Sequence, residues 1–542
     1  MNRTLRFSLV AAALTIQLAT HAQTRYLQEV FTNSDVVVTA DVPYATNIDF
    51  LTSNFTVVPP VINTINLAMD IYEPDQGVDG VAERPLVIYL HTGNLLPPPF
   101  NSSPNGTRKD SSAVENCRRM ARRGYVAASV SYRLGWNPTA ADVQTRRGTL
   151  LNAVYRAIHD TKMAVRWFKA NADGANTYGI DPDKIILVGE GTGGYITLAY
   201  STLDDPAELF IEKFRPDPFD PSVSYVDTCL VGNIDGFCPA TPCSPVGCLN
   251  LYTPNGYDAD VQFCVNLGGA LADTSWLAPG DVPMVSLHTV RDDFAPFDEG
   301  IVYVPVNPPL EVVELQGANV FIPLANSYGN NDAFATLPDG DPFTDRARAL
   351  YGTTWDVSNG GTLTIASAPE AEGLFPIIRP LRPFLQNEAS PWQWWDPTSP
   401  LALTVVSAGP PPVTAHQAAS ASNPDMSANK GRTYIDTVMG YINPRIVCAL
   451  DLGPCSLVGV NENEDVQGLE LFPNPANERV NVASNLQPVT FFQVFDMNGR
   501  LVQEMSVNSQ RFTIERQGLK PGAYFVKLHF ANGAAVRKLM LD

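Results

Sequence analysis

The stretch DKIILVGEGTGGYITLAY, residues 183–200, decides the fold of this chain. An apolar run that passes through glycines into a helix-forming segment is typical of a buried strand turning sharply into a helix. The apex of such a corner is a strained position, so its neighbours two residues away must be small. Gly189 and Gly193 meet that requirement, but the apex is Gly191. The sequence predicts a corner of the kind that presents a nucleophile, with no side chain at its apex.

On both sides of this stretch, short apolar runs alternate with helical segments, over residues 23–455. The helix LLNAVYRAIHDTKMAVRWFKANA, residues 150–172, has apolar residues at spacings of three and four. Near-continuous apolar runs indicate strands covered on both faces, so we expect an α/β domain with a mainly parallel sheet. Ligands bind such sheets at the carboxyl ends of the strands. The other runs are RPLVIYLHTG from Arg84, GYVAASVSYR from Gly124, VQFCVNLGG from Val261 and VPMVSLHTV from Val282.

Length, charge and the N-terminus limit the classes of function. A chain of 542 residues exceeds one ordinary domain, and its formal net charge of -20 argues against a nucleic-acid partner. Residues 1–22 carry two arginines, an apolar run and a small-residue end, which predicts a secretory signal peptide. No later apolar run is long enough to span a membrane, so we expect an exported protein without a membrane span.

The eight cysteines are most simply explained by disulfides, up to four of them, because the chain is exported. A cluster within the Pro- and Gly-rich residues 229–248 lacks apolar periodicity and would need crosslinks to hold it. Zinc is the alternative, but no histidine lies near the cluster and the spacing is not that of paired knuckles. We expect no metal site and no cofactor. The cluster comprises Cys229, Cys238, Cys243 and Cys248, while Cys448 and Cys455 could close a small ring.

A polar, acidic linker, residues 456–468, separates the main domain from residues 469–542. These last residues alternate strands with turn signals at Asn498-Gly499 and Asn532-Gly533, and predict a small all-β, immunoglobulin-like sandwich. The module resembles the C-terminal sorting domain of the type IX secretion system of Bacteroidota in LFPNPANERV, DMNGRLV, LKPGAYFVKL and VRKLML. The resemblance implies recognition by that secretion machinery, passage through the periplasm and outer membrane, and a secreted or cell-surface location. An ordinary carbohydrate-binding or adhesive sandwich is the alternative.

The main domain resembles the α/β-hydrolase family, in particular its secreted carboxylesterase-like branch. The matching pieces occur in family order over roughly residues 36–300, and the resemblance fades afterwards. It implies an α/β-hydrolase fold that acts on ester substrates. The pieces are INLAMDIYEP from Ile65, LVIYLHTGN from Leu86, MARRGYVAASVSYRLG from Met120, HDTKMAVRWFKANA from His159, YGIDPDKIILVGEGTGGY from Tyr178 and VPMVSLHTVRDDFAP from Val282.

The resemblance implies a triad of nucleophile, histidine and acid, which this chain matches unevenly. Thr192 could replace the missing serine, or could simply cap the helix. Asp292 occupies the family position of the acid, although a loop acid can also cap a turn. His416 follows a long insertion and could be the displaced histidine or a surface residue. Glu190 offers a second route, as a general base acting on water.

Two further groups of residues complete the predicted site. The family's oxyanion loop corresponds here to Thr92, Gly93 and Asn94, whose N–H groups would face a developing negative charge. An insertion of about residues 297–400 contains aromatic residues that could line a pocket for an ester or glycan-like ligand, or pack the insertion onto the core. The next strand after Asp292 is predicted at LEVVELQGANVF from Leu310. The aromatic residues are Trp392, Trp394 and Trp395.

The sequence leaves the activity open. One reading is an exported carboxylesterase-like hydrolase with a nonstandard Gly191-Thr192 elbow. Another is a catalytically inactive relative that acts as a secreted or cell-surface binding protein. A third is a serine enzyme in which residue 191 has been altered.

Overall fold

A computed structural model describes residues 25–453 and 469–541 of the chain, with short gaps. The gaps are residues 242, 244–246, 307, 338–340, 359, 384, 485–487, 497–500 and 531–532. The predicted signal peptide and the predicted linker therefore lie outside the described residues. Two compact units make up the chain, namely Met1–Leu337 with Leu350–Cys455, and Pro338–Ala349 with Ser456–Asp542.

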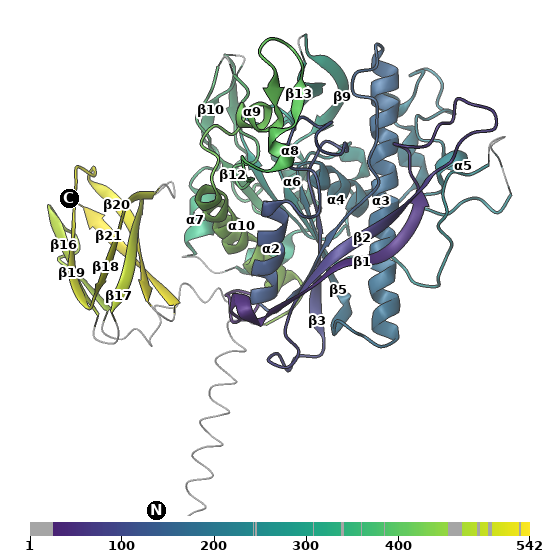
Figure 1. Cartoon of the computed structure of the whole chain (residues 1–542). Helices are drawn as coiled ribbons and strands as arrows, with labels where there is room; N and C mark the ends of the chain where they lie inside the picture. The colour runs from purple at the N-terminus through teal and green to yellow at the C-terminus, as the bar shows by residue number, and fades with distance from the viewer. Residues whose placement is uncertain are drawn as a thin grey trace, which may run out of the picture. The chain divides into compact units, whose positions relative to one another are not determined.

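An eight-stranded sheet forms the centre of the first unit, in the order β1-β2-β4-β3-β5-β6-β7-β12 (Figure 1). The β1–β2 and β2–β4 pairs are antiparallel, and the other neighbours are parallel. The α/β fold with a mainly parallel sheet is therefore confirmed. The strands are β1 (Val36–Ile48), β2 (Thr64–Pro74), β3 (Arg84–Leu90), β4 (Val126–Val130), β5 (Ile180–Glu190), β6 (Phe263–Leu267), β7 (Met284–Thr289) and β12 (Leu374–Ile377).

Helices cover the sheet and bury most of its central strands. Helix α2 (Ser111–Arg122) packs on β4 and on α10 (Ala428–Ala449), while α3 (Val143–Asp173) packs on β5 and on α4 (Thr192–Thr202). Every residue of β3, β4, β6 and β7 is buried, as expected for strands covered on both faces. The helix predicted at residues 150–172 lies within α3. Helix α6 (Ala318–Ser327) packs on β7 and β12.

Smaller elements decorate the loops of this unit. The short helices are η1 (Asn33–Asp35), η2 (Pro206–Phe210), η3 (Glu212–Phe214), α5 (Thr228–Val231), η4 (Thr274–Trp276), η5 (Asp332–Thr336), α8 (Pro400–Leu403) and α9 (Ala415–Ser420). The hairpins are β8 (Glu299–Val304) with β9 (Leu310–Gln316), β10 (Thr354–Asp356) with β11 (Thr362–Thr364), and β13 (Val405–Ser407) with β14 (Val413–Thr414).

The end of the sheet differs from the sequence prediction. Leu310–Gln316 pairs antiparallel with β8 in a separate hairpin, and so does not continue the central sheet. The eighth strand is instead Leu374–Ile377, which pairs in parallel with β7. Because β12 is only four residues long and contains Pro376, it carries no periodic signal. The segment 297–400 is therefore not a single insertion, since it contributes a strand to the main sheet.

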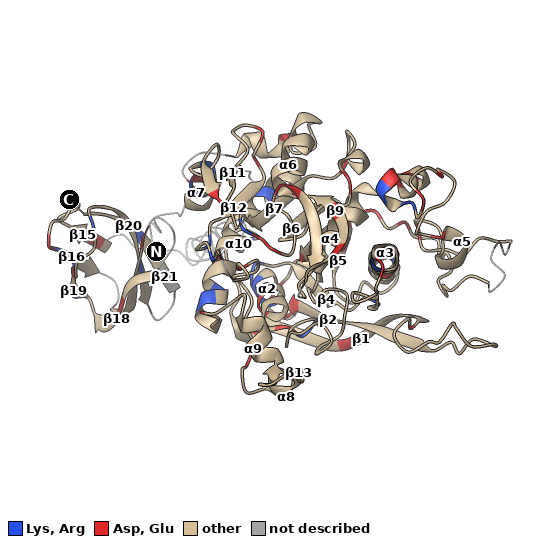
Figure 2. Cartoon of the chain, turned by 90° about the horizontal axis from the view of Figure 1, so that it is seen from above, with Lys and Arg blue, Asp and Glu red and all other residues tan. Residues whose placement is uncertain are grey.

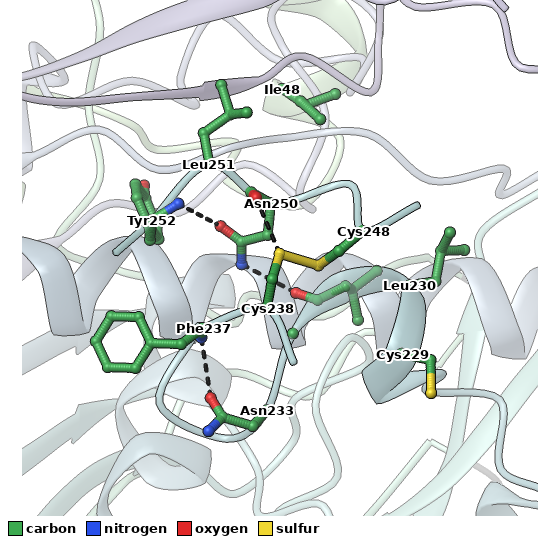
Figure 3. The surroundings of a disulfide bond; sticks show 12 residues. Ile48, Cys229, Leu230, Asn233, Phe237, Cys238, Cys248, Asn250, Leu251 and Tyr252 are labelled. Carbon is green, nitrogen blue, oxygen red and sulfur yellow. Dashed lines mark hydrogen bonds between the residues drawn. A yellow bond between two sulfur atoms is a disulfide. The ribbon is translucent and has the colours of Figure 1, made fainter. Parts of the chain in front are cut away.

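Two disulfides staple the loop between α5 and β6. Cys229 pairs with Cys243 and Cys238 with Cys248, so these cysteines are crosslinked as predicted. Figure 3 shows Asn250 beside the Cys238–Cys248 bond. Its Nδ2 donates a hydrogen bond to the Val231 carbonyl at 2.9 Å. Cys448 is also disulfide-bonded, while Cys455 lies outside the described residues.

The maximum of four disulfides is not reached. Cys117 and Cys264 are buried and unpaired. Among the described residues no group of histidine, cysteine and acidic side chains could hold a metal ion.

The last residues form an all-β module, as predicted. One sheet has the order β15-β16-β19 and the other the order β18-β17-β20-β21, with antiparallel pairing in both. Alternating residues of β20 are buried, in keeping with a sandwich that has one solvated face per sheet. The predicted turns at Asn498-Gly499 and at Asn532 lie outside the described residues. The strands are β15 (Leu469–Phe472), β16 (Arg479–Ser484), β17 (Val489–Asp496), β18 (Leu501–Ser509), β19 (Arg511–Glu515), β20 (Gly522–Phe530) and β21 (Gly533–Leu541), and α7 (Pro342–Arg348) belongs to the same contact unit.

Charged residues are scattered along the ribbon. Figure 2 shows acidic and basic residues interspersed along the ribbon of the described chain. No helix in the described ranges has both the length and the apolar character needed to cross a bilayer.

Candidate functional site

The corner between β5 and α4 is built around Gly191. Its φ of 53° and ψ of -110° lie in a region that residues with a side chain rarely adopt. The Gly191 N–H donates to the Leu267 carbonyl at 2.8 Å, which ties the apex to the end of β6. A Cβ on Gly189 would lie 1.9 Å from Thr197 Oγ1, and one on Gly193 would lie 2.1 Å from the Leu90 carbonyl oxygen. The close approach of helix and strand explains the spacing of the glycines.

Thr92 fills the space in which a side chain at the apex would stand. A Cβ built on Gly191 would lie 2.4 Å from Thr92 Oγ1 and 3.2 Å from Thr92 Cβ. A serine at residue 191 would therefore require the Thr92 side chain to rotate away. The sequence predicted only a backbone role for Thr92, and no local pattern signals the role of its side chain.

Thr192, the predicted substitute nucleophile, lies at the first position of α4 and is 5% exposed. Its Oγ1 accepts a hydrogen bond from the Asn94 N–H at 2.8 Å. The Asn94 carbonyl in turn accepts from Trp136 Nε1 at 2.7 Å. The predicted oxyanion loop and the helix start are thus joined, and in the described chain no side-chain base hydrogen-bonds to Thr192.

Glu190 points into the protein. Its carboxylate accepts hydrogen bonds from Tyr89 Oη at 2.6 Å, Ser112 Oγ at 2.9 Å and Gln393 Nε2 at 2.6 Å. Burial raises the pKa of Glu190, and these hydrogen bonds oppose the rise. Because its oxygens are occupied by these donors, Glu190 is placed to anchor the segment around Gln393 to the corner.

Asp292 follows the end of β7, and its side chain is only 1% exposed. One oxygen, Oδ1, accepts from the N–H groups of Phe294 at 2.7 Å and Ala295 at 2.9 Å. The other, Oδ2, has no hydrogen-bond partner in the described structure. His288 Nε2 comes within 3.4 Å of Oδ2, and it also lies 3.3 Å from the Ala295 carbonyl.

His416 lies on α9 and has other partners. Its Nδ1 accepts from Trp395 Nε1 at 3.1 Å, and Ser420 Oγ lies 3.2 Å from the same atom. Over the described ranges, no hydrogen bond joins His416 to Asp292 or to Thr192. The structure therefore brings Thr192 together with the oxyanion loop, but does not link the three predicted triad residues in a chain.

The three tryptophans have different environments. Trp395 is 7% exposed and lines a pocket, whereas Trp394 packs against Gly431 of α10. Trp392 is fully buried, and its ring lies 3.7 Å from a Cβ built on Gly268, which would also lie 3.8 Å from Asp292 Oδ2. The loop after β12 contains no histidine and leads to Trp392.

A pocket of about 540 Å³ lies between the β5–α4 corner, which forms one wall, and the residues around Asp292, which form the opposite wall. Its apolar part is made by α3, α4 and the β8–β9 hairpin, and polar groups gather near Asn94 and around residues 101–105 and 386–393. The volume falls in the usual range of about 300–1,000 Å³ for small-molecule sites. Several predicted site residues line it, namely Thr92, Gly93, Asn94, Gly191, Thr192, Asp292 and Trp395.

Comparisons with known proteins match both parts of the chain. A family model described as BD-FAE matches residues 69–226, and the model of the secretion system C-terminal sorting domain matches residues 470–542. No curated protein matches the chain.

Similar solved structures include forms of Thermogutta terrifontis esterase 2. The form phosphorylated by paraoxon is 18% identical over 43% of this chain and 69% of that chain, with a TM-score of 0.26. The propionate-bound form is 17% identical over 43% and 70%, with a TM-score of 0.26. The form phosphoramylated by tabun is 16% identical over 49% and 76%, with a TM-score of 0.28.

Proposed function

Because the chain carries a BD-FAE α/β-hydrolase domain of the esterase type and a type IX sorting domain, we propose that it is an exported binding protein. It holds a small molecule in the esterase cleft and does not hydrolyse esters by the serine mechanism. The ester or glycan-like ligand expected from the sequence stays a prediction.

The arrangement of Gly191 and Thr92 carries this proposal. The apex has no nucleophile, and the Thr92 hydroxyl stands within 2.4 Å of the position of the missing Cβ. Loss of the serine from a serine hydrolase costs about a millionfold in turnover, so a glycine at the apex is sufficient to silence the serine mechanism. The position of Thr92 also disfavours a simple serine enzyme altered at residue 191, since a serine there would require the Thr92 side chain to rotate away.

The opposite wall supports the same proposal. A triad needs a histidine between its acid and its nucleophile. Here the loop after β12 places Trp392 near Asp292, and His416 hydrogen-bonds with Trp395. Meanwhile the pocket itself is intact, which favours retained binding.

Hydrolysis by Thr192 is the second candidate function. The hydroxyl lines the pocket and lies 2.8 Å from the Asn94 N–H, so a charged oxygen there would be stabilised. This candidate needs a base within hydrogen-bond reach, as for any hydroxyl nucleophile.

Hydrolysis of a chromogenic short-chain ester, p-nitrophenyl butyrate, tests both candidates. We expect the wild-type rate to equal the background rate without protein, and Thr192→Ala to leave it unchanged. Gly191→Ser alone is also expected to stay at background, because Thr92 obstructs it and no histidine activates it. Thr433→Ala, a threonine on α10 that bonds to the Asn429 carbonyl, is the matched control.

Turnover well above background that disappears in Thr192→Ala, but persists in Thr433→Ala, would contradict the binding-protein proposal. Strong turnover gained by Gly191→Ser alone would show that Thr92 and the missing histidine are not barriers.

The route of export is proposed to run through the periplasm. The sorting domain indicates an exported, secreted or cell-surface protein, and the N-terminal 22 residues are proposed to direct the first step. Deletion of residues 2–22 should leave the protein in the cytoplasm, whereas deletion of residues 469–542 should leave it in the periplasm. Cell fractionation distinguishes the two outcomes, and surface display of either truncated form would contradict the route.

A further inference from the structure

We propose that the ligand of this pocket is an apolar molecule that carries one positive charge, with its charged end against Asp292. This inference rests on the proposed function, because it names the class of ligand that the same pocket binds.

The apolar body of the ligand follows from the lining of the pocket. Apolar side chains from α3 and from the β8–β9 hairpin line it, together with the ring of Phe214, and they include Leu150, Val154, Val302 and Val312. Such a lining favours burial of hydrocarbon, at about 25 cal/mol per Å² of apolar surface. A cavity of about 540 Å³ accommodates a chain or ring system well beyond a short acyl group.

The charge of the ligand follows from the titratable residues in the lining. Asp292 and Glu388 line the pocket, whereas no lysine, arginine or histidine does so among the residues the structure describes. Glu388 already has ion-pair partners in Arg379 and Lys430. In the described structure Asp292 has only His288 within ion-pair distance, at 3.4 Å, and His288 carries a charge only when it is protonated. Asp292 is thus the acid left for a ligand, and an anionic ligand would bury a second negative charge beside it.

The geometry around Asp292 places its unpaired oxygen beside open space. A methyl-sized group on Gly268 would lie 3.8 Å from Oδ2 and 3.7 Å from the Trp392 ring, with no nearer atom beyond the chain neighbours of Gly268. Gly268 itself lines the pocket. Room for a small group therefore exists next to the one carboxylate oxygen that has no hydrogen-bond donor.

The negative charge of Asp292 also acts on a neighbouring residue of the pocket lining. Tyr195, which lines the pocket, has a raised pKa, chiefly through burial and then through the charge of Asp292. An ammonium or guanidinium group would supply both the missing donor and the missing counter-charge. His288 does not replace it, because its approach at 3.4 Å makes no hydrogen bond to Oδ2.

Isothermal titration of the full-length protein with octylammonium, octanol and octanoate tests the proposal, since these probes share a chain and differ in the head group. We expect octylammonium to bind at least about tenfold more tightly than octanol, and octanoate to bind most weakly. Asp292→Asn keeps the Oδ1 acceptor and should remove the preference for octylammonium while leaving octanol unchanged. Asp293→Asn, the adjacent acid that bonds to Asn387, is the matched control and should bind like wild type.

Val154→Trp should fill the pocket and weaken all three probes. Equal or tighter binding of octanol or octanoate, or an unchanged preference in Asp292→Asn, overturns the charged-ligand proposal but leaves the binding function standing. Unchanged binding in folded Val154→Trp, or no binding of any probe, also overturns it. Ester turnover that depends on Thr192 would instead overturn the proposed function, so the two failures are distinguishable.

Discussion

The two walls of the pocket are built in different ways. At the β5–α4 corner the backbone turns sharply, with Gly191 at a φ of 53°, and no side chain stands at its apex. At the opposite wall, the Asp292 carboxylate and the buried Trp392 ring both lie within 4 Å of the position of a Cβ built on Gly268. The corner is therefore held by close contacts of its backbone with neighbouring atoms, whereas the opposite wall depends on the packing of side chains from separate segments.

The largest loss of stability is expected when one methyl group is added to the corner. Gly193→Ala would place a Cβ 2.1 Å from the Leu90 carbonyl oxygen, so α4 or β3 must move. We expect a loss of about 5 kcal/mol in the free energy of unfolding, or failure to fold. Urea unfolding followed by circular dichroism measures the change.

The matched control is Gly80→Ala, where nothing lies within 4 Å of the added Cβ. It should change the free energy of unfolding by less than about 1 kcal/mol. Equal effects of the two substitutions would mean that the corner is not held by steric demands.

The corner shows how much of the fold could be predicted from the sequence. The apolar runs identified β3, β4, β5, β6 and β7, because fully buried parallel strands leave an unbroken apolar signal. The glycine spacing around residue 191 is equally local, since each glycine answers a contact made within a few residues of the turn or with the adjacent strand. The all-β tail was predictable for the same reason.

The opposite wall shows why the rest could not be predicted. β12 has four residues, too few for a period, and the more apolar Leu310–Gln316 was predicted in its place. The contacts of Thr92 with Gly191, of Gln393 with Glu190 and of Trp395 with His416 join residues from different segments. Such pairings depend on tertiary packing, which leaves no mark in local patterns.

A substitution on the opposite wall tests how much a buried side chain there contributes to stability. Trp392→Ala removes a fully buried ring beside Gly268 and should reduce the free energy of unfolding by about 3–5 kcal/mol. Denaturant unfolding measures the loss. Trp394→Ala removes a ring that is only partly buried and should cost less. If Trp392→Ala is the milder substitution, the ring does not support this wall.

The loop between α5 and β6 is held by disulfide bonds, so we expect the stability of the protein to depend on them. The Cys238–Cys248 bond spans a sequence separation of 10 residues, and closing a loop of that size stabilises a protein by about 3 kcal/mol in the chain-entropy account. We expect Cys238→Ser with Cys248→Ser to lower the free energy of unfolding by about 2–3 kcal/mol. Thermal unfolding with and without reductant checks this, since reductant should then add only the effect of the remaining disulfides.

The free energy of unfolding is also expected to change with pH, by less than in the preceding variants, because Asp110 is buried near Glu190 of the corner. Burial raises the pKa of Asp110 to about 8, and the charge of Glu190 adds to the rise. A carboxyl whose pKa is higher in the folded state binds its proton more tightly there, so stability falls as pH rises from about 4 to about 8. Burial lowers the pKa of His91 to about 4, which acts in the opposite direction below pH 6.5.

The window from pH 6.5 to pH 8 therefore isolates Asp110 from His91. Wild type should lose at most about 2 kcal/mol of unfolding free energy across it, and Asp110→Asn should flatten that slope. Asp142→Asn is the matched control, because both acids directly precede a helix, but the pKa of Asp142 is lowered by hydrogen bonds from Thr145. A slope that survives in Asp110→Asn would assign the titration to another group, and would separate the stability of the corner from the charge buried behind it.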